Sequence, residues 1–166
     1  MSNLGVHPVD VDGPATAHPT PFRCRIDVAP SQESAEVSHI NNIEFMRWID
    51  RGSELHCDAC GWTRQQLLDA GVMWFVARHE VDYLAEASAA DDLLLTTWVE
   101  DVRRVKSWRS TVIHRLGPGE PVPVCQARTL WVLVDLSTRR PCSVPLEMAR
   151  AFDPLERPRL AKDTLA

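Results

Sequence analysis

The chain has 166 residues, 45% of them hydrophobic, which is enough to bury the core of one domain. Its 18 Lys and Arg against 23 Asp and Glu give a net charge of −5, which disfavours nucleic-acid binding because phosphates require a basic surface. No apolar run reaches the roughly 18–20 residues of a membrane span. Five cysteines, an odd number, do not suggest a disulfide framework, and the N-terminal residues lack the pattern of a secretory signal. We therefore expect a cytoplasmic protein that binds neither nucleic acid nor membranes.

The two ends of the chain differ in composition from its middle. Residues 1–20 contain three Pro and two Gly without a hydrophobic period, which predicts a flexible leader. Residues 153–166 contain two Pro and scattered charges, which predicts a C-terminal tail. Residues 21–152 are therefore expected to form a single domain.

The first predicted elements are a strand and a long helix. Apolar and polar residues alternate over Phe22–Val28, as in a half-buried strand. From Asn41 to Cys60 the apolar residues recur every three or four positions, which predicts a helix. Asn41 suits the N-cap, Glu44 completes a pattern like a capping box, and Gly61 suits the end of the helix.

A short helix is predicted over Thr63–Ala70 and another over Val144–Phe152. Between them the sequence predicts four strands joined by short links: Val72–Leu84, Asp92–Val102, Lys106–Leu116 and Val122–Leu136. Short links favour antiparallel neighbours, and one long helix can cover only one face of a sheet. We therefore predict an α+β fold in which a curved antiparallel sheet lies against one long helix.

Two details refine this prediction. Gly52 in the middle of the long helix costs about 1 kcal/mol of helix propensity, which indicates close approach of the sheet or of a dimer mate. The strand at Lys106–Leu116 is expected to carry on one face the residues Trp108, Ser110, Val112, His114 and Leu116.

The segment His39–Asp50, HINNIEFMRWID, resembles the "H-V-N-N-x-x-Y-x-x-W-x-E" run of hotdog-fold thioesterases of the 4-hydroxybenzoyl-CoA thioesterase-like group, which act on acyl-CoA or acyl carrier protein thioesters. Ala77–Leu84 is similar to part of the "R-x-x-I-x-Y-x-x-P-A" strand of this group, Asp91–Leu93 to its "G-D-x-L", and Val134–Pro141 to its "V-D-x-x-T-x-R-P". The resemblance implies a single hotdog domain and a thioester hydrolase.

The chain departs from the group just before the helix. Members usually carry "D-x-D-x-x-G-H", in which the second Asp falls on Ala35 and the Gly on Ser38 of this chain. The nearest carboxylates are Glu36 and Glu33. The resemblance therefore makes these two glutamates the candidates for activating water, while side chains of a solvated loop are the alternative.

Hydrolysis of a thioester needs an activated water, donors for the developing oxyanion and an apolar slot for the acyl group. In this group the start of the central helix supplies the donors, which implies the backbone from Ile40 to Ile43 and the amide of Asn41 or Asn42. His39 is a candidate general base because an imidazole, whose ordinary pKa is near 6.5, can take a proton from water at neutral pH. Asn41 as a helix cap and His39 as a structural residue are the alternatives.

Three further residues are candidates for the site. Asp50 stands where the group carries Glu on the central helix, and its alternatives are a surface charge or a salt bridge. Arg103 and Arg109 belong to a local basic cluster that is predicted to contact the phosphates of coenzyme A, or else forms a solvated sheet edge.

Cys57 and Cys60 form one CxxC pair without a second one, so we expect no metal site and no cofactor apart from the coenzyme A of the substrate. Hotdog sheets pair side by side, which implies a homodimer or a dimer of dimers with the site between subunits. The predicted function is a metal-independent acyl-CoA thioesterase. Alternatives are an acyl carrier protein thioesterase, a hotdog dehydratase or hydratase, and a non-catalytic hotdog module that binds acyl thioesters or a partner protein.

Overall fold

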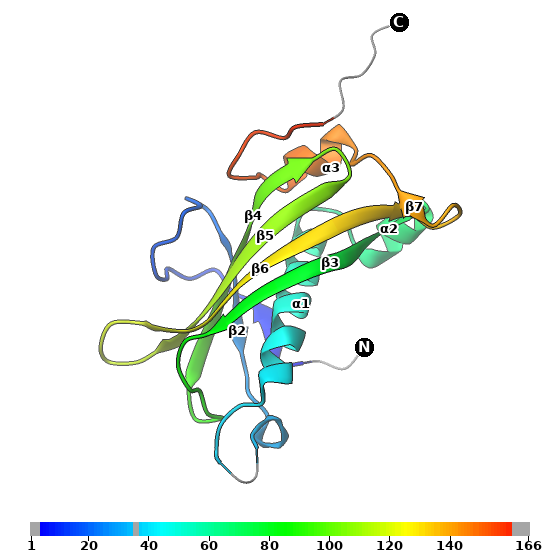
Figure 1. Ribbon diagram of the computed structural model, residues 1–166. Helices are drawn as coiled ribbons and strands as arrows, with labels where there is room; N and C mark the ends of the chain where they lie inside the picture. Colours follow the sequence, from blue (N-terminus) through cyan, green and yellow to red (C-terminus); the bar gives the residue numbers. More distant parts are fainter. Residues whose placement is uncertain (1–3, 35–36, 161–166) are drawn as a thin grey trace, which may run out of the picture. The chain divides into compact units, whose positions relative to one another are not determined.

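The computed structural model describes residues 4–34 and 37–160 (Figure 1). It confirms the predicted α+β class, with each helix and strand predicted from Phe22 onward present within about two residues of the expected bounds. The elements in chain order are β1 (Val6–Pro8), β2 (Phe22–Ile26), the 3-10 turn η1 (Pro30–Gln32), α1 (Asn42–Ala59), α2 (Arg64–Asp69), β3 (Val72–Tyr83), β4 (Asp92–Arg103), β5 (Lys106–Leu116), β6 (Val122–Asp135), β7 (Arg140–Pro141) and α3 (Leu146–Ala151).

The strands pair in the order β1-β2-β4-β5-β6-β3, and β7 pairs with the end of β6. Strands β2 and β4 are antiparallel, with a register that runs from Phe22 opposite Thr97 to Ile26 opposite Leu93. Strand β3 precedes β4 in the sequence but lies beside β6 at the end of the order. One edge of β3 therefore has no neighbouring strand in the described part of the chain.

Strand β1 lies inside the segment that was expected to be a flexible leader. Its Val6 pairs with Ile26 of β2 and is only 3% exposed. Three residues are too few to show a hydrophobic period, and the pairing with β2 supplies the order that the composition did not indicate. The domain bounds of 21–152 stay a prediction, and the tail beyond residue 160 lies outside the described residues.

The described residues form two compact units. The first comprises the described residues within Met1–His56, Val81–Thr97 and Thr111–Ala127, and the second those within Cys57–Glu80, Trp98–Ser110 and Arg128–Ala166. Elements such as α1 and β4 begin in the first unit and end in the second. Among the described helices, none combines the length and apolar character that a membrane crossing needs.

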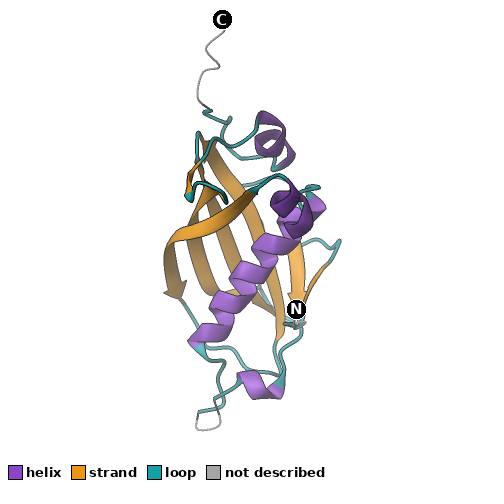
Figure 2. Cartoon of the chain, turned by 90° about the vertical axis from the view of Figure 1, so that its right-hand side faces the viewer, coloured by secondary structure: helices purple, strands orange, loops and turns teal. Residues whose placement is uncertain are grey.

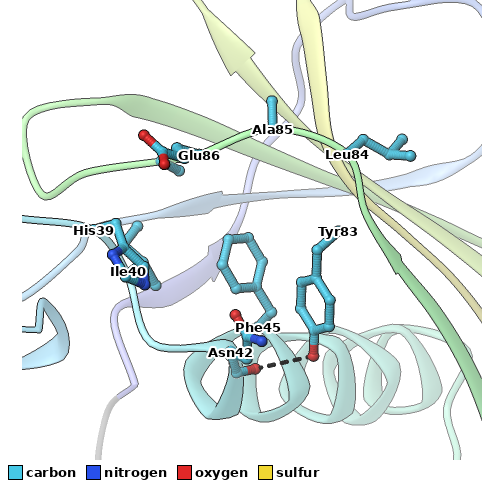
Figure 3. Close-up of a pocket in the computed structure, with 9 residues that line it drawn as sticks. His39, Ile40, Asn42, Phe45, Tyr83, Leu84, Ala85 and Glu86 are labelled. Carbon is cyan, nitrogen blue, oxygen red and sulfur yellow. Dashed lines mark hydrogen bonds between the residues drawn. The ribbon is translucent and has the colours of Figure 1, made fainter. Parts of the chain in front are cut away.

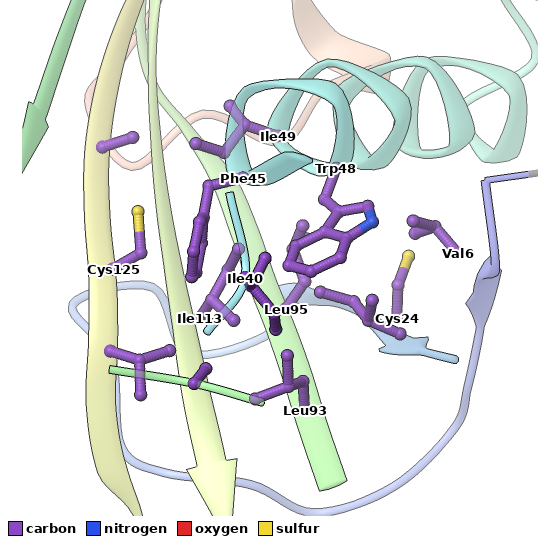
Figure 4. Close-up of a cluster of buried hydrophobic side chains, with 14 residues drawn as sticks. Val6, Cys24, Ile40, Phe45, Trp48, Ile49, Leu93, Leu95, Ile113 and Cys125 are labelled. Atoms are coloured by element: carbon purple, nitrogen blue, oxygen red, sulfur yellow. The ribbon is translucent and has the colours of Figure 1, made fainter. Parts of the chain in front are cut away.

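In the first unit α1 packs against one face of the strands (Figure 2). Trp48 and Ile49 of the helix are fully buried, and the rings of Phe45 and Trp48 meet edge to face at 5.3 Å. These side chains share a core with strand residues that include Cys24, Leu93, Leu95, Ile113 and Cys125 (Figure 4). The burial of this apolar helix face is what holds the start of α1 in place.

Gly52 of α1 lies against Leu95 of β4. A Cβ atom at this position would be 2.7 Å from Cδ2 of Leu95, which is less than a carbon–carbon contact allows. The prediction that this glycine permits close approach of the sheet is confirmed.

The second unit has its own core, built around Val99, Val102, Leu133 and Met148. The rings of Trp74 and Phe152 lie 6.1 Å apart within it. Thr63 caps α2 by accepting a hydrogen bond from the backbone N–H of Gln66, whose side chain in turn accepts from the Thr63 N–H.

Candidate active site

A pocket of about 280 Å³ lies at the start of α1, within the first unit (Figure 3). One side comes from the segment that leads into α1 and from its first turn, and the other from the end of β3 and the residues after it. The lining residues are His39, Ile40, Asn42, Phe45, Tyr83, Leu84, Ala85, Glu86 and Ala87. The pocket thus combines apolar side chains with an imidazole, a carboxylate, a phenol and an amide.

The peptide group between His39 and Ile40 is held at both its carbonyl and its N–H. The N–H of Ser34 donates to the carbonyl of His39 at 2.8 Å, and the N–H of Ile40 donates to the carbonyl of Ala87 at 2.9 Å. Ser38, which stands where the resemblance expects Gly, has the left-handed φ of 42° that Gly adopts most easily. The chain therefore keeps the turn that precedes the helix although it lacks the glycine.

Asn41 is the N-cap of α1, as predicted. Its side-chain oxygen accepts a hydrogen bond from the Ile43 N–H at 3.0 Å. The capping box is not formed, because the Glu44 carboxylate instead accepts from Gln32 at 2.7 Å and from Arg47 at 2.6 Å. The buried carboxylate of Glu44 gains more from these two side-chain donors than from one backbone N–H.

Tyr83 closes one side of the pocket. Its hydroxyl donates to the backbone carbonyl of Asn42 at 3.3 Å, and its ring meets that of Phe45 at 5.7 Å. Burial, and to a lesser degree the nearby Cys125 thiol, raises the pKa of Tyr83 above its usual value. The phenol is therefore neutral near pH 7 and acts as a hydrogen-bond donor.

The structure brings two of the predicted site residues into this pocket, His39 and Asn42. Asn41 and Ile43 lie beside them at the helix start, where Ile43 is 58% exposed. The carboxylate of Glu33 accepts a hydrogen bond from the Ala89 N–H, which ties two loops together.

Two roles predicted near the helix are not tested. Glu36 and Ala35 lie outside the described residues. Asp50 is exposed and is not among the residues that line the pocket. The roles predicted for Glu36 and Asp50 stay predictions.

The two predicted phosphate contacts lie in the second unit and do not line the pocket. Arg109 is only 5% exposed, and this burial lowers its pKa to about 10, partly offset by the Cys57 and Cys60 thiols. A buried guanidinium does not suit the predicted contact with coenzyme A. Arg103 is half exposed and forms an ion pair with Asp101 at 2.6 Å, so its predicted role is not tested.

The reason for the burial of Arg109 is the alternation of β5. Its inward face carries Ser107, Arg109, Thr111 and Ile113, whereas Trp108 on the other face is only partly buried. This alternation agrees with the expected placement of Trp108, Ser110 and Val112 together on one face of the strand.

Sequence reasoning gave no site role to Tyr83 or Glu86. A signal existed, because the motif "R-x-x-I-x-Y-x-x-P-A" extends beyond the matched strand to Ala87. Read to its end, it places Tyr83 on the motif's Tyr and Glu86 on the motif's Pro. The carboxylate in the pocket therefore stands at a position where the motif has no ionisable group.

The CxxC pair ends α1 in the second unit. The thiol of Cys57 donates to the carbonyl of Trp62 at 3.1 Å, and burial raises the pKa of Cys60. Across residues 4–34 and 37–160, His, Cys, Asp and Glu form no group of three or more that could hold a metal ion.

The likeness to solved structures shows the hotdog fold. A mutant of 4-hydroxybenzoyl-CoA thioesterase in complex with 4-hydroxybenzoyl-CoA superposes with a TM-score of 0.74 at 18% identity, covering 80% of this chain and 98% of that one. A 1,4-dihydroxy-2-naphthoyl-CoA thioesterase from Synechocystis gives 0.72 at 16% identity, covering 84% and 100%. A Lactobacillus plantarum protein described as an oleoyl thioesterase gives 0.75 at 14% identity over 89% of this chain, which spans 55% of that protein's length.

The protein therefore has a hotdog fold, and its pocket lies at the start of the long helix α1. The family model of the thioesterase-like superfamily matches residues 6–152, and the chain belongs to this superfamily. A search of curated proteins finds no match. The predicted class, a hotdog thioester hydrolase, is thereby confirmed.

Proposed function

We propose that the protein hydrolyses an acyl-CoA to the free acid and CoA-SH, without a metal ion, in the pocket at the start of α1. The observation that carries this proposal is the pocket itself, in which an imidazole and a helix start face an apolar wall. The apolar side chains of Ile40, Phe45 and Leu84 suit an acyl group. Membership of the thioesterase-like superfamily and the acyl-CoA thioesterases among similar structures support the same reaction.

The helix start supplies the donor for the carbonyl oxygen. Since the Ile43 N–H already bonds to Asn41, the N–H of Asn42 is the group that we assign to the developing oxyanion. One such donor is typically worth about 10²–10³ in rate. Of the residues predicted to activate water, His39 lines the pocket, and Glu36 lies outside the described residues.

We further propose that the working unit is a homodimer or a dimer of dimers that forms through β3. This strand ends the strand order, and its Phe75 and Val76 are 44% and 38% exposed. An exposed apolar strand edge is normally covered in a stable protein. We place the protein in the cytoplasm because its five cysteines, all of them among the described residues, form no disulfide bond.

The test is thiol release from a panel of short, long and aromatic acyl-CoAs, with a control without substrate for the protein's own cysteines. Turnover on any class establishes the reaction and names the acyl group. His39→Ala is expected to lower kcat. As a control, heat-denatured protein should release no thiol from the substrate. If the protein hydrolyses only acyl carrier protein thioesters, its substrate is the carrier protein thioester and not an acyl-CoA.

A second candidate is a hotdog module that binds acyl thioesters or a partner protein without turnover. The observation in its favour is Ala35, which stands where the group usually has its Asp. Saturable binding of an acyl-CoA without any thiol release would support this candidate and refute hydrolysis.

A further inference from the structure

We propose that Glu86 is the carboxylate that deprotonates the attacking water. This inference rests on the proposed function and names a catalytic residue for it. Among the described residues that line the pocket, Glu86 is the one carboxylate and His39 the one imidazole. Figure 3 shows Glu86 on the segment after β3 and His39 on the segment before α1, at the same end of the pocket.

The backbone on both sides of Glu86 is fixed. The N–H groups of Leu84 and Ala85 donate to the carbonyl of Val124 at 2.9 and 3.3 Å. On the other side, the carbonyl of Ala87 accepts from the N–H of Ile40, the residue next to His39. These bonds hold Glu86 and His39 on adjoining segments, as a pair of groups that share one water would require.

The side chain of Glu86 is exposed, and its main chain is held by Arg115. Its backbone carbonyl accepts a hydrogen bond from Nη1 of Arg115 at 2.8 Å, which anchors the main chain. The carboxylate of Glu86 has no ion-pair or hydrogen-bond partner within the described residues, although the Arg115 side chain contacts the main chain of Glu86. The carboxylate of Glu33, by contrast, is engaged by the Ala89 N–H, so it is less suited to bind water.

The proposed reaction returns Glu86 to its starting state after two proton transfers. The carboxylate of Glu86 takes one proton from water while the water oxygen bonds to the thioester carbonyl carbon, and the Asn42 N–H donates to the oxyanion. The carbon–sulfur bond then breaks, and its electron pair leaves with the sulfur. The proton held by Glu86 passes to this thiolate, which gives a carboxylic acid, a free thiol and the original carboxylate.

The test compares Glu86→Gln with Glu120→Gln, which removes an equal charge from an exposed turn outside the pocket. Because general bases contribute about 10²–10⁴, we expect Glu86→Gln to lower kcat at least about 100-fold and to change KM less than threefold. Glu86→Asp should recover part of kcat, and Glu120→Gln should match the unmodified protein.

Two results overturn the inference, and they are distinguishable. If the unmodified protein releases thiol and Glu86→Gln keeps its kcat, Glu86 is not the base although the protein is a thioesterase; a large loss in Glu36→Gln would then assign the role to Glu36. If the unmodified protein hydrolyses no acyl thioester, the proposed function fails and the inference with it. Equal thermal unfolding of the Glu86→Gln and unmodified proteins shows that any loss of kcat is chemical.

Discussion

The contact between Gly52 and Leu95 predicts the sign of a substitution that helix propensity alone would predict wrongly. In a helix interior, Gly to Ala stabilises by about 1 kcal/mol. Here the new methyl carbon would lie 2.7 Å from Cδ2 and 3.1 Å from Cδ1 of Leu95, which is fully buried. Inserting a methyl group into a packed core costs about 1–3 kcal/mol. We therefore expect Gly52→Ala to destabilise the protein by up to about 2 kcal/mol.

A second variant, Leu95→Val, lacks both Cδ atoms that the new methyl group would meet. It therefore separates the cost of this contact from the gain in helix propensity. In that background the methyl group added to the helix has room, and Gly52→Ala should become stabilising by about 1 kcal/mol, the propensity gain alone. The difference between the two backgrounds is the coupling between the residues, expected at about 1–3 kcal/mol.

Urea unfolding followed by tryptophan fluorescence measures these changes, since Trp48 is fully buried one turn before Gly52. Protein concentration is held fixed because association would add to the apparent stability. A Gly52→Ala protein that is more stable by about 1 kcal/mol with Leu95 intact would refute the packing argument.

Substitutions at three other positions test separate features. Asn41→Ala should lower the free energy of unfolding by about 1 kcal/mol through loss of the helix cap, and Asn41→Asp should retain it, as thermal unfolding can check. Burial lowers the pKa of His114, so the unfolded chain binds the proton first as the pH falls below about 6.5, and stability decreases there. Replacing His114 by Gln should flatten this decrease between pH 8 and 5 in urea titrations, and an unchanged slope would exclude His114 as its source. Phe75→Glu, on the edge of β3, should shift the protein to monomers in sedimentation without altering its circular dichroism.

The long elements could be predicted because their periods extend over many residues. The helix predicted over Asn41–Cys60 is observed over Asn42–Ala59, and the strand over Lys106–Leu116 has the predicted bounds. Strands β1 and β7, with three and two residues, are too short for a period and form by pairing with β2 and β6. The buried face of β5 could not be predicted because it carries Arg109 and two hydroxyl residues, whose burial is decided by tertiary packing.

The site was predicted in part for a similar reason. His39 and Asn42 adjoin in sequence and belong to one motif, so their proximity was evident. Glu86 follows them by more than 40 residues and meets them through the pairing of Ile40 with Ala87, which no local pattern encodes. Asp50 stands at the Glu position of the motif, but its place on an exposed turn of α1 depends on how the helix rotates against the sheet.

The two cysteines in the core of the first unit have a consequence for any thiol-based assay of this protein. Burial raises the pKa values of Cys24 and Cys125 to about 12, so both stay protonated near pH 7 and react slowly with thiol dyes. A dye reaches them only when the core opens. Their labelling rate in the absence of substrate therefore measures how often the first unit opens, in the same reaction mixture that detects CoA-SH.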